Sequence, residues 1–301
     1  MNKIAVIGSI STDFVVTTNI RPEIGETITG NDFNTTFGGK GANQAIAAAR
    51  LGGNIHMIGA VGEDVFGDQL LENLTQNNID VHSVERVTHL PSGSAHITLM
   101  NNDNAIIYIA GANDAVTVDK ITELAPVLET SDIIIIQNET PHAVVEQVLL
   151  YGAEKDVPVL YNPAPARTIE TALMEKAAYF TPNESEFHLL FPELTISQGV
   201  ALYPNKLLIT LGSKGVLYHD GTKEVLIPSY AVQPVDTTGA GDTFNGAFAV
   251  AIASGMPIKE SVKFGNLAAS LSIQKFGAQG GMPTLEELKR SPFYEKTWHI
   301  K

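Results

Sequence analysis

The sequence predicts an α/β protein with a doubly wound, mostly parallel sheet flanked by helices, together with a small β-sheet lid. Short apolar runs rich in β-branched residues recur along the chain, and helix-length stretches separate many of them. Two further segments show the alternation that is typical of antiparallel strands. Alternating strands and helices form βαβ units, in which the parallel sheet is buried on both faces.

Six apolar runs are the expected core strands, and most of them end in small or polar residues. They cover residues 4–9, 54–62, 132–139, 157–163, 177–184 and 206–213. Helices are expected between them over residues 43–51, 66–77 and 141–155, and another in LEELKR near the C-terminus. This order favours one buried parallel sheet over separate β and α regions.

Two regions interrupt the alternation, at about residues 14–37 and 92–110. In the second region SAHITLM and AIIYIAG alternate on either side of the turn-forming Asn101-Asn102-Asp103-Asn104. Both regions leave the core near its early strands, so they can combine into a small sheet over the ligand crevice, which lies at the carboxyl ends of the strands. No repeat or long linker is present, and we expect one domain over residues 1–301 with these two insertions as a lid.

Composition indicates a soluble globular protein. The 301 residues are 44% hydrophobic and 17% charged, and no apolar run approaches the ~18 residues of a membrane span. The N-terminus MNKIAVIGS lacks the features of a secretory signal, so the expected location is the cytoplasm. The net charge of −14 argues against binding to nucleic acid or to an anionic membrane, although a locally basic site can still bind a small anion.

The absence of cysteine limits the possible chemistry. Disulfides, thiolate metal sites and cysteine nucleophiles are excluded, because the chain contains no thiol. Catalysis therefore has to use oxygen and nitrogen groups.

Two familiar nucleotide motifs are not matched. The P-loop requires serine or threonine after Gly-Lys, but Lys40 is followed by Gly41. Gly239 and Gly241 have the first spacing of the dinucleotide fingerprint, but Phe244 occupies the position of its third glycine. If the protein binds a nucleotide, it must hold the phosphates in another way.

The segment VDTTGAGDTFNGAFAV offers such a way. A helical apolar pattern follows Gly241 and ends before Gly255; its members are Phe244, Ala247, Phe248, Ala251 and Ile252. Backbone N–H groups of the Gly-Ala-Gly run can bind an anion at this helix N-terminus. Asp242 in the first turn is then either an ordinary first-turn acid or a base that takes a proton from an acceptor hydroxyl beside the bound phosphoryl group.

A second helix is predicted in FGGKGANQAIAAARLGG, residues 37–53. Its apolar stripe consists of Ala42, Ala45, Ile46 and Ala49. Close backbone packing explains the glycines, whereas Lys40 and Asn43 at the start of the helix can also hydrogen-bond a polyhydroxyl ligand. From these residues alone, both interpretations remain open.

Two acids follow apolar runs at the edge where ligands bind to such sheets. Asp13 lies in GSISTD after the first run, and Glu139 ends IIIIQNE. Either carboxylate can accept hydrogen bonds from sugar hydroxyls or be a solvated loop acid. The segments TPNE, 181–184, and TLGSKG, 210–215, are strand-end turns that can also contact a nucleotide.

Together these segments resemble the ribokinase-like sugar kinases, the PfkB family, over nearly the whole chain. FGGKGANQA is similar to the first signature of the family and DTTGAGDTFNGA to the second, while QNE, NPAPAR, TPNE, TLGSKG and FGAQ stand in the expected order. The resemblance implies a helix-flanked sheet with a β-lid, a homodimer formed through that lid, and ATP-dependent phosphorylation of a sugar. D-ribose is the expected acceptor and D-ribose 5-phosphate the expected product.

The resemblance also implies residue roles. Asp242 is the base, and the N–H groups of Ala240 and Gly241 form the anion hole. The sugar contacts, in addition to Asp242, are Ser11, Asp13, Gly39, Lys40, Asn43 and Glu139. Contacts to ATP and its Mg²⁺ fall on Asn183, Glu186, Thr210, Gly212, Ser213, Lys214, Gly215, Gly241 and Asn266. A monovalent cation, K⁺, is expected largely on backbone carbonyls at Asp236, Thr238, Ser272, Lys275, Gly277 and Gly281.

Two features depart from the family pattern. Ser11 stands where these kinases commonly have asparagine against the sugar, so 2-deoxyribose, another sugar or a nucleoside is the alternative acceptor. The connection over residues 185–206 is shorter than usual. Two other classes remain as rivals: a sugar-binding regulator without turnover, and a nicotinamide dehydrogenase, which the failed fingerprint disfavours.

Overall fold

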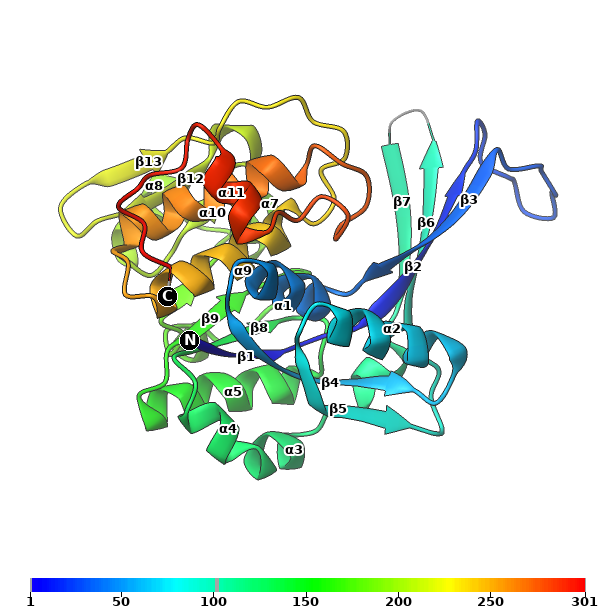
Figure 1. Ribbon diagram of the computed structural model, residues 1–301, viewed down its shortest axis with the longest axis horizontal. Helices are drawn as coiled ribbons and strands as arrows, with labels where there is room; N and C mark the ends of the chain where they lie inside the picture. The colour runs from blue at the N-terminus through cyan, green and yellow to red at the C-terminus, as the bar shows by residue number, and fades with distance from the viewer. Residues whose placement is uncertain (1, 101–102, 301) are drawn as a thin grey trace.

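A parallel six-stranded sheet forms the centre of the molecule, as seen in the computed structural model, which describes residues 2–100 and 103–300 (Figure 1). Its strand order is β10-β9-β8-β1-β4-β5, and each adjacent pair is parallel. The strands are β1 (Lys3–Ile7), β4 (Asn54–Gly62), β5 (Asp80–Val87), β8 (Ile133–Gln137), β9 (Val159–Asn162) and β10 (Tyr179–Phe180). The predicted doubly wound parallel sheet is confirmed.

Helices cover both faces of this sheet. On one face lie α1 (Lys40–Arg50), α2 (Val65–Gln76), α9 (Ala240–Ala253), α10 (Ile258–Ser272) and α11 (Leu285–Arg290). On the other lie α3 (Val118–Glu123), α4 (Ala125–Glu129), α5 (His142–Lys155) and α6 (Thr171–Met174). Alternate residues of one strand enter the two cores, since Ile133 and Ile135 pack with the first group and Ile134 and Ile136 with the second.

A small sheet stands out from the body of the molecule (Figure 1). It has the order β3-β2-β6-β7 and consists of β2 (Ser11–Thr17), β3 (Asp32–Gly38), β6 (Gly93–Met100) and β7 (Asp103–Ile109). The predicted antiparallel pairing is confirmed within β2–β3 and within β6–β7, whereas the joining pair β2–β6 is parallel. Of the expected turn Asn101–Asn104, the first two residues lie outside the described residues.

The core strand expected over residues 206–213 is observed in part, because Lys206 and Leu208 bond in parallel with Phe180 of β10 but the chain turns back after Thr210. This segment contains only β11 (Ile209–Thr210), which pairs antiparallel with β12 (Val216–His219), and β12 pairs with β13 (Glu224–Ile227) in a separate sheet. Gly212 and Gly215 have φ values of +56° and +103°, so the chain turns back through the 3₁₀ turn η2 (Gly212–Lys214). Two isolated bridges, including Asn183 with Thr210, join β11 to the neighbourhood of the central sheet.

The short connection over residues 185–206 is filled by α7 (Glu184–Leu190) and α8 (Ile196–Leu202). Capping boxes begin both helices, with Asn183 and Thr195 as the capping residues. Phe187 and Val200 are buried in the same core as α5, so both helices pack against the body of the protein.

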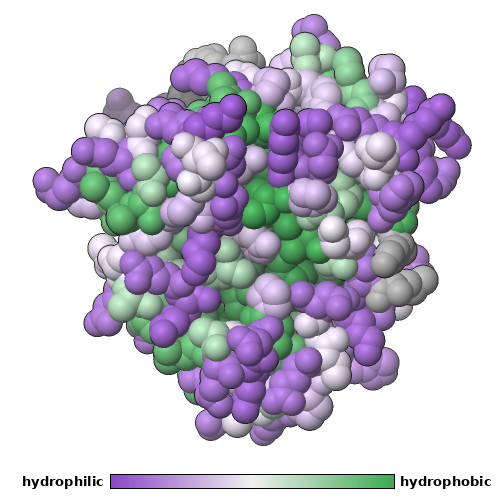
Figure 2. All heavy atoms as spheres, turned by 90° about the vertical axis from the view of Figure 1, so that its left-hand side faces the viewer, coloured by the Kyte–Doolittle hydropathy of each residue, from purple (hydrophilic) through white to green (hydrophobic). Residues whose placement is uncertain are grey.

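One face of the molecule is largely hydrophilic (Figure 2). Figure 2 shows polar residues over most of the face that lies at the left of Figure 1, with apolar residues gathered near its centre. Within the described residues, we find no helix with both the length and the apolar composition needed to cross a membrane.

Candidate active site

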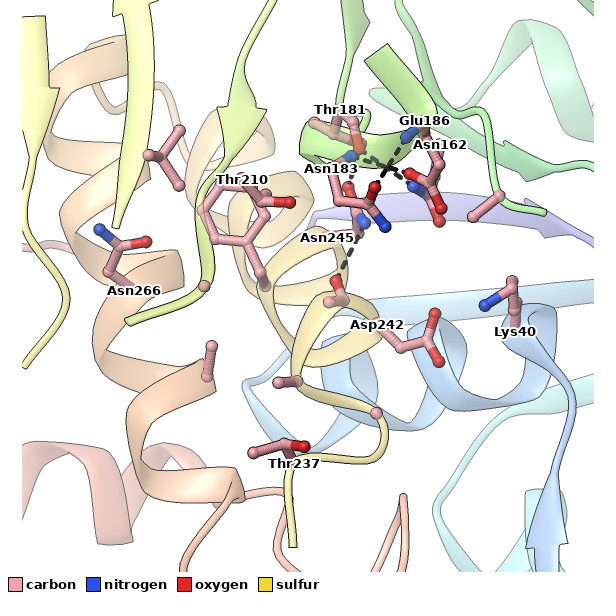
Figure 3. Close-up of a pocket in the computed structure, with 18 of the residues that line it drawn as sticks. Lys40, Asn162, Thr181, Asn183, Glu186, Thr210, Thr237, Asp242, Asn245 and Asn266 are labelled. Atoms are coloured by element: carbon pink, nitrogen blue, oxygen red, sulfur yellow. Dashed lines mark hydrogen bonds between the residues drawn. The ribbon is translucent and has the colours of Figure 1, made fainter. Parts of the chain in front are cut away.

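A cavity of about 350 Å³ lies beyond the carboxyl ends of β9 and β10. Figure 3 shows Lys40 and Asp242 facing each other at one end of it, and Thr210 and Asn266 at the other. Its polar lining includes Lys40, Asn162, Thr181, Asn183, Glu186, Thr210, Thr237, Asp242, Asn245 and Asn266. The sequence-predicted base and nucleotide contacts are thus brought to one place from distant segments.

The N-terminus of α9 opens into this cavity. Gly239 caps the helix with φ of +76°, and a Cβ there would lie 2.8 Å from the carbonyl oxygen of Ala278. A Cβ on Gly241, in contrast, would have no heavy atom within 4 Å. The Ala240 N–H reaches the carbonyl of Thr237 at 3.3 Å, while helix geometry leaves the N–H groups of the first turn without intrahelical acceptors. An anion can therefore approach this helix end closely.

Asp242 is only 7% exposed, and both of its carboxylate oxygens accept hydrogen bonds from α1. Asn43 Nδ2 donates to Oδ2 at 2.9 Å, and Gln44 Nε2 donates to Oδ1 at 2.9 Å. An acid that served only the first turn of its own helix would not require two buried amides from another helix. Gln44 was missed by the sequence analysis, although it directly follows Asn43 in FGGKGANQA.

Glycines explain how α1 and α9 come close enough for these bonds. A Cβ on Gly246 of α9 would lie 2.6 Å from the carbonyl oxygen of Gln44. A Cβ on Gly41 would lie 2.5 Å from the backbone of Gly8, and Gly39 begins α1 with φ of +87°. The packing interpretation of the glycines in FGGKGAN is therefore confirmed, and Lys40 lines the cavity, where a ligand could contact it.

Lys40 lies among four carboxylates. Burial favours the neutral amine, but the negative charges of Asp242, Glu139, Glu186 and Asp13 outweigh it and raise the pKa of Lys40 above its ordinary value. Glu139 also accepts the backbone N–H of Lys40 at 3.0 Å and the hydroxyl of Ser9. The ammonium group is thus charged at neutral pH and partly balances the acids around it.

Asp13 is buried within β2 rather than in a loop after the first strand. Burial raises the pKa of this carboxyl, Glu139 and Asp242 raise it further, and Lys40 and the Ser11 hydroxyl lower it, so that it is about 7. Gly38 on the paired strand leaves room for the carboxylate, since a Cβ there would collide with it. Ser11, which begins β2, is buried beside Gly38 and Gly93.

On the nucleotide side, Asn183 and Glu186 begin α7 and bond to each other through the capping box. Burial raises the pKa of Glu186, and the negative charge of Asp242 raises it further. The hydrogen bond from the N–H of Asn183 and the charge of Lys40 lower this pKa by less, so the net shift is upward. Glu186 thus belongs electrostatically to the same group as Lys40 and Asp242.

The turn after β11 forms the far wall of the cavity. Gly212 and Gly215 line it, and Asn266 on α10 donates from Nδ2 to the carbonyls of Ile227 and Pro228 at 2.9 and 3.1 Å. Ser213 and Lys214 lie in the same turn with exposed side chains. Backbone atoms therefore form much of this wall.

The residues expected around a monovalent cation lie in two segments beside α9, residues 236–238 and 272–281. We call these two segments together the cation loop. The carboxylate of Asp236 accepts the N–H groups of Thr238 and Gly277, both at 2.9 Å. Burial raises the pKa of Asp236, but these hydrogen bonds outweigh it and the net shift is downward. Gly281 packs directly on the carbonyl of Ser272, and the side chain of Lys275 instead lies 3.7 Å from Glu287.

This donor set fits a monovalent cation in kind. No group of three or more histidine, cysteine or acidic side chains within residues 2–100 and 103–300 is arranged to hold a metal ion. A cation here would instead meet one carboxylate and several backbone carbonyl oxygens, which are hard ligands.

Comparisons with known proteins agree with this geometry. Ribokinase of Bacillus subtilis is 52% identical over 289 residues, covering 96% of this chain and 99% of the relative. Ribokinase of Lactococcus lactis is 47% identical over 290 residues, covering 96% of each chain. The solved structure of Arabidopsis thaliana ribokinase with ribose and ATP is 31% identical and superimposes with a TM-score of 0.88, covering 96% of this chain and 98% of that one.

A family model gives the same result over most of the sequence. The model described as pfkB family carbohydrate kinase matches residues 1–285, which include the predicted base, both glycine-rich segments and the cation loop. Together with the high identity to curated relatives over nearly full length, this match shows that the chain belongs to the pfkB family of carbohydrate kinases.

Proposed function

We propose that this protein is an ATP-dependent sugar kinase that phosphorylates D-ribose at O5. The observation that carries the proposal is the arrangement at α9, where a carboxylate held by two amides lies beside an open helix N-terminus. The relatives named ribokinase, and the Arabidopsis structure with ribose and ATP, support this acceptor and this phosphoryl donor.

In this mechanism Asp242 takes the proton of the sugar hydroxyl as that oxygen attacks the γ-phosphorus of ATP. Asn43 and Gln44 each donate one hydrogen bond to a different oxygen of the Asp242 carboxylate. Each oxygen keeps a second lone pair that can accept the proton of the hydroxyl. The N–H groups of Ala240 and Gly241 hold the transferred phosphoryl group, whose charge they stabilise in a partly buried site. Positioning and charge neutralisation thus provide most of the catalysis.

The acidic groups around Lys40 bind the sugar. Asp13 and Glu139 accept hydrogen bonds from its hydroxyls, and Lys40 and Asn43 donate to its oxygens. Ser11 and Gly39 complete this side of the site. The raised pKa of Asp13 indicates a crowded set of acids, and a ligand with several hydroxyl donors relieves that crowding by satisfying them.

ATP occupies the cavity from Asn266 to Gly241. Asn183 and Glu186 line the cavity on the side where the phosphates would lie, and they would hold the Mg²⁺ of the nucleotide, which would supply positive charge to those phosphates. K⁺, when bound at the loop of Asp236 and Gly277, supplies positive charge next to the anion hole. The loop contacts the hole through Ala278 and Gly239.

The small sheet is proposed to act as a lid and as the contact between two copies of the chain. Its strands carry exposed apolar side chains, including Phe33 at 58% and Ile107 at 70% exposure, and a second copy would cover them. Light scattering should give the mass of a dimer for the wild type and a smaller mass for Ile107→Glu.

A coupled ADP-release assay tests the proposed function. Wild-type protein is assayed with D-ribose, 2-deoxyribose, other pentoses, hexoses and nucleosides, with and without K⁺. The highest kcat/KM is expected with D-ribose, and K⁺ should raise it. Tight sugar binding without ADP release would instead identify a regulator, and a higher kcat/KM for another acceptor would replace ribose.

A further inference from the structure

The base is connected to a chain of three side-chain amides that extends through the cation loop, and two of them, Asn43 and Gln279, are buried. Asn73 on α2 donates from Nδ2 to Gln279 Oε1 at 2.9 Å, and Gln279 donates from Nε2 to Asn43 Oδ1 at 2.9 Å. Asn43 in turn donates to Asp242 at 2.9 Å. This amide chain joins segments as far as 236 residues apart in the sequence.

The direction of these bonds is fixed by the carboxylate at their end. An ionised carboxylate only accepts hydrogen bonds, so Asn43 has to present its nitrogen to Asp242. Its oxygen then faces Gln279, which has to present its own nitrogen, and the oxygen of Gln279 faces Asn73. Because leaving a buried donor or acceptor without a partner destabilises the fold, each amide constrains the next.

Gln279 belongs to the loop between α10 and α11, and its backbone is held there too. Arg50 donates to the carbonyls of Gln279 and Met282 at 2.6 and 3.0 Å. The neighbouring Ala278 packs on Gly239 at the helix cap. The same loop therefore contacts the anion hole through its backbone and the base through the side chain of Gln279.

We propose that Gln279 is a positioning residue that fixes the orientation of the Asn43 amide, and through it the orientation of the Asp242 carboxylate. The inference rests on the proposed function, since it concerns the base of that reaction. Gln44 restrains the other carboxylate oxygen and is itself bonded by Gln137 at 2.8 Å. Gln279 differs because it connects the base to the cation loop.

The sharpest test is Gln279→Glu, which keeps the shape of the side chain. An ionised glutamate cannot donate, so Asn43 turns its nitrogen toward residue 279 and its oxygen toward Asp242. We expect kcat with D-ribose at pH 8 to fall at least about 10-fold, which corresponds to about 1.4 kcal/mol in the barrier. The KM for ATP should stay near the wild-type value.

The pH dependence separates this effect from a loss of structure. A protonated glutamic acid donates from its O–H and restores the chain, so the ratio of variant to wild-type kcat should rise as the pH is lowered. Gln76→Glu places the same charge at an exposed position on α2, outside the cation loop, and should leave kcat unchanged at each pH. Thermal unfolding is measured under the same conditions. A wild-type kcat for Gln279→Glu at pH 8, or a loss that follows the unfolding temperature, would overturn the inference.

A second measurement does not depend on turnover. The side-chain N–H signals of Asn43 are recorded by ¹⁵N NMR in sugar-free protein and assigned with Asn43→Asp. They should shift and exchange faster with solvent in Gln279→Met than in the wild type, because the freed Asn43 amide no longer keeps one orientation. Unchanged Asn43 signals in Gln279→Met reject the positioning role whatever the kinase assay gives, whereas an inactive wild type rejects only the proposed function.

Discussion

The two ends of the central sheet carry similar residue types but differ in how their charges are balanced. A second cavity, of about 290 Å³, lies at the amino ends of the strands, opposite the candidate site. Beside it His56 lies between Asp80 and Ser83, with Nδ1 3.0 Å from Asp80 Oδ2 and Nε2 2.8 Å from Ser83 Oγ. The order of these groups matches that of a serine hydrolase triad.

The surroundings of this triad do not provide for catalysis. Ser83 is buried at 7% exposure and does not line the cavity. Burial raises the pKa of Asp80, but hydrogen bonds from His82 and the charge of His56 outweigh it, and the net shift is downward. At the candidate site the pKa of Asp13 is raised instead. The amino end thus pairs its charges and stabilises the fold, whereas the carboxyl end keeps acids crowded together for a ligand.

Replacing the base should give the largest effect. Asp242→Asn keeps the shape and removes the proton acceptor, so kcat should fall at least about 100-fold, as is typical for a general base. Steady-state kinetics with D-ribose measure this, and circular dichroism checks the fold. Turnover close to the wild-type rate would show that Asp242 is only a first-turn acid.

A methyl group at the anion hole should affect activity without harming the fold. Gly241→Ala adds a Cβ that meets open space, so we expect equal or slightly higher stability, by up to about 1 kcal/mol. The methyl group enters the cavity where the phosphoryl group binds, and kcat/KM should fall about 10-fold. Gly246→Ala is the matched control, because its Cβ would meet the carbonyl of Gln44 at 2.6 Å and should destabilise the protein.

Asp13→Asn should separate binding from stability. The folded-state pKa of Asp13, about 7, is raised above the ordinary value of an aspartate, so the native state binds more protons between these two values. The contribution of Asp13 to stability is therefore fully present below pH ~4 and is lost as the pH rises toward 7. Asp13→Asn should raise the unfolding temperature at pH 8 and increase the KM for the sugar several-fold. A lower unfolding temperature at pH 8 would contradict the crowding of acids.

The smallest effect is expected at the amino end. Ser83→Ala removes one buried hydrogen bond to His56 and should lower the free energy of unfolding by about 1 kcal/mol. Urea denaturation measures this change, and sugar kinase kinetics should be unaltered. A change in kcat would mean that the two ends of the sheet are coupled in function.

The sequence predicted the elements whose burial pattern is regular. The apolar spacing after Gly241 corresponds to α9, and the stripe that begins at Ala42 corresponds to α1. α9 ends before Gly255 and α1 ends at Arg50, just before the Leu-Gly-Gly that follows it. β5 was missed because DVHSVERV is an edge strand with a mostly polar sequence. The strand expected over residues 206–213 ends at Thr210, since the chain turns back at Gly212 and the apolar run gives no sign of that turn.

At the site, local sequence patterns identified the acids and the glycines but not the side-chain amides that hold the acids in place. Asp13, Glu139 and Asp242 were recognisable from strand ends and a helix start. Gln279 stands in the quoted segment FGAQ, yet nothing local indicates that its amide reaches Asn43. Such contacts depend on how loops and helices pack in three dimensions, and the local sequence pattern does not determine that packing.

The contact between α1 and α9 at Gly246 separates the proton acceptor from the residues proposed to select the sugar. The base and the two amides that hold it belong to two helices whose backbones are in direct contact, and we call these three residues the base unit. Ser11 and Asp13 lie on β2, outside that unit. Substitution at Ser11 can therefore alter which sugar fits while the proton-accepting apparatus keeps its geometry, which makes β2 the natural place to engineer a different acceptor.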